Sequence, residues 1–205
     1  MFQRVSPDLV LVALKEAQPR GIAPSRLRIN PGEAFPPTHP TTRLCLDLLG
    51  EALQAGPVNC LLDVGCGSGI LGLAAAVLGV PRVTGMDTKW EAAAAARLNA
   101  RENALGEALL VFQGSTECVR GRFDLVAANL PVEVQQDKAA ELDRLAAVEG
   151  TLILSGFRDD QEGPLLEHYT RLGWTLGRRR VKYFWHPELP PNISFNWVAW
   201  LLSRV

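Results

Sequence analysis

Asp63-Val64-Gly65-Cys66-Gly67-Ser68-Gly69 is the stretch that decides the fold of this 205-residue chain. It follows the apolar run 59–62 and opens a second apolar segment, 70–80. A strand, a tight glycine turn and a helix in this order are typical of a doubly wound α/β sheet, in which a nucleotide-like ligand binds at the turn. Glycines at alternate positions let the backbone come close to such a ligand, because no Cβ lies between them.

The residue that discriminates between ligands is Asp63, two positions before the first glycine. A carboxylate at the strand end favours a cationic amino group and would repel a pyrophosphate. We therefore predict S-adenosylmethionine, which carries an ammonium and a sulfonium, as the cofactor. A dinucleotide remains an alternative, because residues 67–72 match the pattern G-x-G-x-x-G, although in that pattern the first glycine follows the strand directly. A glycine turn with a purely structural role is the third interpretation.

Composition indicates one globular domain over residues 1–205, with 47% hydrophobic and 21% charged residues. A net charge of −1 gives no general attraction to nucleic acid or to an anionic membrane. No signal peptide is visible, and no apolar run reaches the roughly 18 residues that a membrane span needs. The four cysteines are scattered and form no C-x-x-C pair, so we expect reduced thiols in the cytoplasm and no bound metal.

Hydrophobic periodicity predicts alternating strands and helices, and hence a mostly parallel sheet with right-handed crossovers. The expected helices are 6–17, 41–53, 69–79, 90–104, 133–147 and 160–171, the first capped by Ser6 and the second by Thr41 or Thr42. The expected strands are 26–30, 59–64, 82–87, 108–113, 123–128, 150–155, 174–184 and 194–202. No helix separates the last two strands, so they should form an antiparallel hairpin at one edge. This arrangement resembles the seven-stranded, Rossmann-like sheet of class I methyltransferases.

Residues at the ends of the strands are the candidates for the site, because ligands of such sheets bind there. The turn from Gly65 through Cys66 and Gly67 to Gly69 should wrap the methionyl and ribose portion of the cofactor. Asp87, with Thr88 beside it, ends the next strand and can accept two hydrogen bonds from a ribose diol. A helix N-cap is the alternative role for Asp87. Ser115 follows the third strand and is placed at the adenine edge, although a plain turn explains it equally well.

Asn129-Leu130-Pro131-Val132 follows the fourth strand and is predicted to hold the methyl acceptor. Methyl transfer from a sulfonium is an in-line displacement, so an enzyme mainly has to position the attacking atom. The Asn129 side-chain oxygen and a backbone carbonyl at Leu130 can accept hydrogen bonds from an N–H group and aim its nitrogen. Asn129 as a simple strand-end turn residue is the alternative interpretation.

From Arg28 to about Ser155 the chain resembles the PrmA family, bacterial methyltransferases that modify the ribosomal protein L11. The matching stretches are 31–35, 38–46, 63–70, 85–87 and 128–130. The resemblance implies cofactor contacts at Gly65, Asp87 and Asn129. It also implies that a loop before His39 covers the cofactor, with Thr38 as the contact. In the family this loop reads Gly-Thr-Gly-Thr-His, whereas here it is Pro36-Pro37-Thr38-His39, shorter and without glycine.

We expect the single domain to divide into residues 1–55, with an N-terminal helix, a strand and the covering loop, and a catalytic core at 56–205. The resemblance favours a protein amine as the acceptor, in a ribosomal protein or another protein. The family has an N-terminal substrate-recognition domain, and only about thirty residues precede the matching region here. Residues 129–132 also resemble the N-x-P-aromatic motif of adenine and glutamine methyltransferases, but Val132 cannot stack on a base.

Three other functions are compatible with the sequence. The segment from Arg178 to Trp185 combines four cations with three aromatic residues, a composition suited to RNA. Its residues alternate between two faces if it is a strand, and a solvated edge strand with Tyr183 and Trp185 buried is the simpler explanation. A small-molecule nitrogen methyltransferase and a catalytically silent cofactor-binding module are the remaining alternatives.

Overall fold

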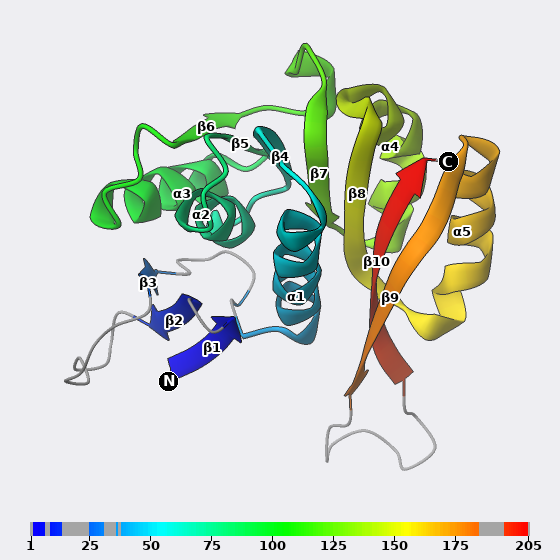
Figure 1. Cartoon of the computed structure of the whole chain (residues 1–205), viewed down its shortest axis with the longest axis horizontal. Coiled ribbons are helices and arrows are strands. Elements are labelled where there is room, and N and C mark those ends of the chain that lie inside the picture. Colours follow the sequence, from blue (N-terminus) through cyan, green and yellow to red (C-terminus); the bar gives the residue numbers. More distant parts are fainter. Residues whose placement is uncertain are drawn as a thin grey trace.

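The computed structural model describes residues 2–6, 9–13, 25–30, 36, 38–184 and 195–204. Its main element is a seven-stranded sheet with the order β6-β5-β4-β7-β8-β10-β9 (Figure 1). The strands are β4 (Cys60–Val64), β5 (Arg82–Asp87), β6 (Leu109–Gln113), β7 (Phe123–Asn129), β8 (Ala146–Arg158), β9 (Trp174–Phe184) and β10 (Phe195–Arg204). All pair in parallel except β10, which is antiparallel to both β8 and β9. The predicted fold class is confirmed.

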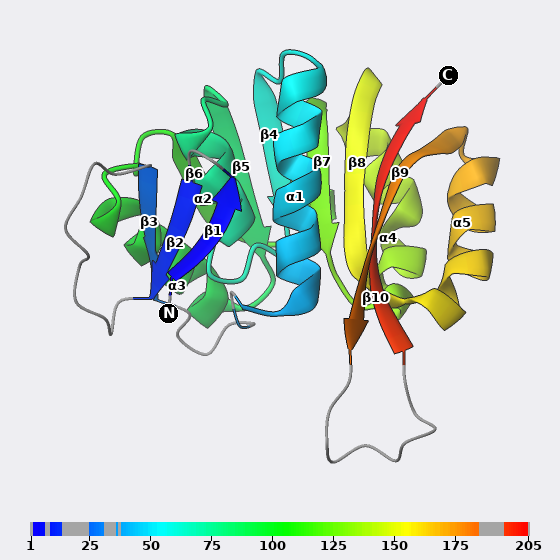
Figure 2. The same cartoon turned by 60° about the horizontal axis from the view of Figure 1, so that its bottom comes forward.

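Among the described residues, α-helices α1 to α5 cover the two faces of this sheet (Figure 2). On one face lie α1 (Pro40–Ala55), α2 (Ile70–Val77) and α3 (Trp90–Glu102), which share a core with the inward side chains of β4 to β8. On the other face lie α4 (Val132–Leu145) and α5 (Glu162–Arg171), which pack over β7, β8 and β10. Each central strand is therefore apolar on both faces, as expected of strands in a covered parallel sheet.

Strand order reverses on either side of β4, because the chain adds β5 and β6 on one flank and then β7 and β8 on the other. The C-terminal ends of β4 and β7 consequently lie side by side, with Val64 opposite Ala128 in the register. A crevice forms at such a switch point, since the connections leaving the two strands diverge to opposite faces. The glycine turn and the Asn129 turn are thereby placed beside each other.

The N-terminal segment corrects one prediction. A helix was expected over 6–17, but the structure has β1 (Phe2–Ser6) and β2 (Leu9–Ala13), with β3 (Ser25–Ile29), in a separate sheet of order β1-β2-β3. The run Leu9-Val10-Leu11-Val12 contains β-branched residues, which favour a strand, and it pairs in parallel with β3. Pairing with a distant strand outweighed the local capping signal of Ser6. Residues 7–8 and 14–17 of the expected helix lie outside the described residues.

The start of α1 corrects a second prediction. Thr41 or Thr42 was expected to cap this helix, whereas His39 is the N-cap and Pro40 is the first helical residue. The Nδ1 atom of His39 accepts the backbone N–H of Thr41 at 3.3 Å, and it lies 2.8 Å from the Thr41 hydroxyl oxygen. Proline suits the first helical position because its missing N–H is not needed there. His39 thereby gains a defined orientation at the edge of the crevice.

Two asparagines of the α3 region attach β3 to the main domain. The Oδ1 atom of Asn103 accepts a hydrogen bond from the Arg28 N–H at 2.8 Å, and its Nδ2 atom donates one to the Arg28 carbonyl at 2.7 Å. Asn99 is fully buried and makes the same pair of bonds with the backbone of Asn30, both at 2.9 Å. Its amide also donates to the carbonyl of Ser68 in the glycine turn, at 2.8 Å. Asn99 therefore links the N-terminal segment to the turn that decides the fold.

Candidate functional site

The C-terminal ends of the central strands border a cavity of about 900 Å³. Its wall consists of the turns that follow β4, β5, β6 and β7, together with residues of α1, β8 and β10. The predicted residues that line it are Gly65, Gly67, Asp87, Thr88, Ser115, Asn129 and Leu130. The predicted residues outside the lining are Thr38, Asp63, Cys66 and Gly69. The structure therefore brings most of the predicted set into one place.

The glycine turn depends on left-handed backbone conformations at Gly65, Gly67 and Gly69, whose φ angles are 66°, 55° and 79°. Other residues rarely adopt such angles. A Cβ on Gly65 would lie 2.3 Å from a methyl carbon of Leu130, so this glycine also allows the Asn129 turn to approach. A Cβ on Gly69 would lie 3.0 Å from the Cβ of Ala96 in α3. Gly65 and Gly67 thus line the cavity, whereas Gly69 allows the turn to pack closely against α3.

Asp87 joins the glycine turn to the start of α3. One carboxylate oxygen accepts the N–H of Gly67 at 3.0 Å, and the other accepts the N–H of Lys89 at 2.9 Å. A carboxylate has about four acceptor sites, so each oxygen can still accept a hydrogen bond from a hydroxyl group of a ligand in the cavity. The alternative role of Asp87 as an N-cap is wrong, because Lys89 is the N-cap of α3 and no described side chain caps this helix. The predicted ribose contact stays a prediction.

Asp63 is buried and lies outside the cavity lining. One of its carboxylate oxygens accepts the N–H of Gly72 in α2, at 3.0 Å. Burial raises the pKa of Asp63 to about 7, and the nearby charge of Asp87 adds to this effect. The side chain is thus directed toward α2, and its contact with a ligand ammonium stays a prediction.

The turn Asn129-Leu130-Pro131 forms the part of the cavity wall that lies beside the glycine turn. Within the part of the chain that the structure describes, the Asn129 side chain makes no hydrogen bond, so its amide is available to a ligand. The Leu130 N–H donates to the Ser155 carbonyl at 2.9 Å. The next residue of β8, Gly156, has a φ of 102°, and a Cβ there would lie 2.2 Å from the Leu130 carbonyl oxygen. The turn is therefore pressed directly against β8.

Val132 is buried and does not line the cavity. The position that holds a stacking aromatic residue in adenine and glutamine methyltransferases therefore offers no platform here. Val134, which is partly exposed, lies at the cavity instead. An aliphatic side chain contributes apolar contact area without selecting a planar acceptor.

His39 and Trp197 form a third part of the wall. Their rings meet edge to face, with centroids 5.0 Å apart, and Phe195 packs in the same manner on Trp197 at 5.3 Å. Burial lowers the pKa of His39, which favours its neutral form. Sequence reasoning missed Trp197. The period of two along β10 could have indicated it, because Phe195 and Trp197 fall on one face of the strand and Trp200 on the other.

Ser115 donates to the carboxylate of Glu117, which also binds Lys138 of α4 at 2.8 Å. Ser115, Thr116 and Lys138 all line the cavity. Charge-assisted bonds to Lys138 and Ser115 lower the pKa of Glu117 to about 2. The turn after β6 is thus tied to the helix that follows the Asn129 turn.

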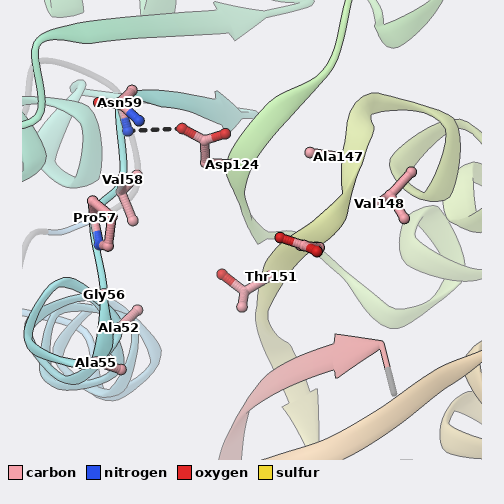
Figure 3. Close-up of a pocket in the computed structure, with 11 residues that line it drawn as sticks. Ala52, Ala55, Gly56, Pro57, Val58, Asn59, Asp124, Ala147, Val148 and Thr151 are labelled. Atoms are coloured by element: carbon pink, nitrogen blue, oxygen red, sulfur yellow. Dashed lines mark hydrogen bonds between the residues drawn. The ribbon is translucent and has the colours of Figure 1, made fainter.

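A second hollow, of about 590 Å³, lies at the opposite end of the strands (Figure 3). It is bordered by the end of α1, the segment leading into β4, and the starts of β7 and β8. Asp124 accepts the N–H groups of Asn59 and Cys60 there, at 2.7 and 3.1 Å. None of the predicted site residues lines this hollow.

The basic segment of β9 is partly neutralised by carboxylates. Arg180 binds Glu51 of α1 at 2.7 Å, and Arg179 binds Glu162 of α5. Tyr183 is 58% exposed on the edge strand of the sheet, so the prediction that it is buried is wrong. Trp185 lies outside the described residues. The segment does not present four free cations to a nucleic acid.

Among the residues with described positions, no group of three or more His, Cys, Asp or Glu side chains is arranged to hold a metal ion. Likewise, no helix in the described ranges is both long enough and apolar enough to cross a membrane.

The fold and the cavity define a Rossmann-like domain of the class I methyltransferase type. The family model described as "Ribosomal protein L11 methyltransferase (PrmA)" matches residues 3–187. The chain belongs to this family. It is 38% identical over 176 residues to a ribosomal protein L11 methyltransferase of Syntrophotalea carbinolica, covering 85% of this chain and 57% of that protein. It is 39% identical over 160 residues to one of Geobacter metallireducens, covering 78% and 52%.

A solved structure of similar shape is that of ribosomal protein L11 methylase from Lactobacillus delbrueckii subsp. bulgaricus. It has a TM-score of 0.76 and 27% identity, and the match covers 98% of this chain and 96% of that one. Magnesium protoporphyrin IX methyltransferase from Synechocystis, solved with bound S-adenosylmethionine, shares the fold at 20% identity and a TM-score of 0.64, over 80% and 82% of the two chains. The chain spans between about half and three fifths of the length of the curated relatives named above.

Proposed function

We propose that this chain is an S-adenosylmethionine-dependent methyltransferase that transfers a methyl group to a nitrogen of a protein. The observation that carries the proposal is one cavity bordered by the glycine turn, by Asp87 and by the unpaired amide of Asn129. The first two features suit a nucleoside cofactor, and the third suits an N–H acceptor. The names of the relatives support ribosomal protein L11 as the first substrate to test.

The residues of the cavity fit the cofactor. Gly65 and Gly67 leave room where a Cβ would intrude, and Asp87 offers carboxylate lone pairs to a ribose diol. A sulfonium cofactor supplies an electrophilic methyl group without any metal. The pyrophosphate of a dinucleotide would bring two more negative charges beside Asp87 and close to Asp63, which disfavours that alternative.

The chain's own residues position the acceptor. The Asn129 side-chain oxygen can accept a hydrogen bond from an amine N–H and so orient the nitrogen lone pair. Pro131 stiffens the turn, and His39 and Trp197 add an aromatic part to the cavity wall. A lysine or α-amine must lose its extra proton before it can attack, so the rate should rise with pH until that group is deprotonated.

The division into a catalytic core at residues 56–205 and an accessory segment at 1–55 is part of the proposal. It is supported by the presence of His39 and Thr41 in the cavity wall, beside residues of the core. The cytoplasm is the proposed compartment, supported by the free thiols of all four cysteines, Cys45, Cys60, Cys66 and Cys118.

The experiment is a transfer assay with methyl-labelled S-adenosylmethionine and purified L11, followed by the same assay on cell extract. Extract products are digested separately with protease and nuclease. Label in L11, or in protease-sensitive material, supports the proposal. Label that only nuclease releases shows an RNA enzyme, and label that passes a small-pore filter shows a small-molecule enzyme. Cofactor binding without any transfer identifies a silent binding module.

A further inference from the structure

Gln135 is a fully buried amide in the first turn of α4, directly behind the Asn129 turn. It lies next to an apolar cluster that includes Ala139, Leu154 and Phe157. Burying an amide costs free energy unless its polar atoms find partners. The position therefore calls for an explanation in terms of the bonds that the amide makes.

The Nε2 atom of Gln135 donates hydrogen bonds to two backbone carbonyl groups. It donates to the Leu130 carbonyl at 2.8 Å and to the Ser155 carbonyl at 2.6 Å. The Ser155 carbonyl also accepts the Leu130 N–H at 2.9 Å. One side chain thus ties together the end of β7, the turn that leaves it, and the neighbouring residue of β8.

The other end of the same amide has no partner. Among the described residues, Gln135 Oε1 is one of two buried side-chain atoms without a hydrogen bond. The orientation is still unambiguous, because a reversed amide would place its oxygen against two carbonyl oxygens. All hydrogen bonds of this side chain therefore go to the Leu130 turn and to the strand that supports it.

The Leu130 carbonyl is confined from a second direction by Gly156, whose absent Cβ leaves the space that the carbonyl occupies. Gln135 and Gly156 together fix the plane of the peptide that follows Leu130. Asn129 is the preceding residue, and its side chain is the unpaired amide of the cavity. The peptide that joins Asn129 to Leu130 is held by its own N–H, which donates to the same Ser155 carbonyl that Gln135 binds. A shift of this carbonyl would therefore move Asn129 relative to the glycine turn.

We propose that Gln135 is a positioning residue for methyl transfer: by donating to the Leu130 and Ser155 carbonyls it holds the Asn129 side chain at the angle required by the acceptor nitrogen. This inference rests on the proposed function and adds to it a residue that touches neither cofactor nor acceptor. It should act mainly on the chemical step, because the proposed cofactor contacts at Gly65, Gly67 and Asp87 lie on other turns, and only the contact implied at Asn129 lies on this one.

Gln135→Glu is the informative substitution, because it makes the number of donors depend on pH. A protonated carboxyl can donate one hydrogen bond to a carbonyl, whereas an ionised one presents only acceptors to two carbonyl oxygens. Burial disfavours the charged form and raises the pKa of such a group. We expect kcat of Gln135→Glu to fall as pH rises, opposite to the rise expected for the unmodified chain with an amine acceptor.

Two further variants serve as matched tests. Gln135→Met has a similar length and volume, suits the apolar neighbours and lacks both donors, so kcat should drop by roughly tenfold or more at every pH. Tyr169→Phe removes a hydroxyl that donates to the backbone carbonyl of Gln135 at 3.4 Å and leaves the amide untouched, so kcat should stay within about threefold. All three should bind S-adenosylhomocysteine within about threefold of the unmodified chain in calorimetry.

Hydrogen exchange of the Leu130 amide gives a readout that needs no acceptor. It should accelerate in Gln135→Met and stay unchanged in Tyr169→Phe, because only the first variant releases the Ser155–Leu130 link. Unchanged exchange together with an unaltered kcat and pH profile would overturn the inference. If the unmodified chain transfers no methyl group to any acceptor, the proposed function fails, and the exchange comparison alone decides whether Gln135 holds the turn.

Discussion

Replacing Asp63 by asparagine should stabilise the protein increasingly as pH rises. Asp63 is buried, has a single hydrogen bond from Gly72, and has no cation beside it in the described structure. Its pKa is raised from 3.8 to about 7, first by burial and then by Asp87. The native state therefore keeps a proton that the unfolded chain releases, and stability is lost as pH rises from about 4 to 7.

The size of the effect follows from the pKa. At 1.36 kcal/mol per pH unit, the difference between the native and unfolded pKa of Asp63 lowers the free energy of unfolding by about 4 kcal/mol above pH 7, but by less than about 2 kcal/mol at pH 5, relative to strongly acidic pH. Asparagine keeps an oxygen for the Gly72 N–H and never ionises. Its new NH₂ group adds a penalty of about 1–3 kcal/mol if unpaired, and this penalty does not depend on pH. The advantage of Asp63→Asn should thus grow by about 2–3 kcal/mol between pH 5 and pH 8.

Urea unfolding followed by circular dichroism, at intervals from pH 5 to pH 8 and without ligand, measures this difference. Asp160→Asn, a change at an exposed carboxylate, serves as the surface reference. If the difference in stability between Asp63→Asn and the unmodified chain stays constant or shrinks as pH rises, the pKa of Asp63 is not raised in the native state. Repeating the series at saturating S-adenosylhomocysteine tests the predicted ammonium contact, because a nearby cation would reduce the pH dependence.

Three other outcomes are expected. Asn129→Ala should lower kcat by roughly ten- to a thousandfold while the Kd for S-adenosylhomocysteine changes much less; unchanged turnover on an identified acceptor would make the turn structural only. Gly65→Ala should destabilise the protein by about 1–2 kcal/mol in urea unfolding, because φ is 66° and the new Cβ meets Leu130, and a neutral result would contradict the close approach. Replacing Arg178, Arg180 and Lys182 together by alanine should leave activity and its salt dependence nearly unchanged; a large loss with a shallower salt slope would favour RNA as substrate.

The sequence predicted the main sheet well because its signals are local. Apolar runs separated by glycine turns located β4 to β7, and the lack of a helix between the last two strands predicted the antiparallel edge. The N-terminal strands were missed for the opposite reason. The pairing of β2 with β3 joins residues 9–13 to residues 25–29, and capping signals near Ser6 contain no information about that pairing.

The sequence predicted those site residues whose place follows from their position at the end of a strand. Asp87 and Asn129 could be placed because strand ends converge on one edge of the sheet. The direction of a side chain was not predictable in this way. Asp63 turns toward the Gly72 N–H, a bond to the following helix that sequence spacing does not reveal. Trp197 and Gln135 reach the site from β10 and α4, so their roles depend on packing between distant elements.

The central claim is that the cavity between the glycine turn and Asn129 binds S-adenosylmethionine. Isothermal titration calorimetry with S-adenosylhomocysteine tests it most directly, because binding can be measured without knowing the acceptor. We predict a micromolar Kd, equivalent to about 8 kcal/mol, and weaker binding by about 2 kcal/mol in Asp87→Ala, through loss of charge-assisted ribose contacts. Absence of binding, equal binding by Asp87→Ala, or displacement of the ligand by NAD would contradict it.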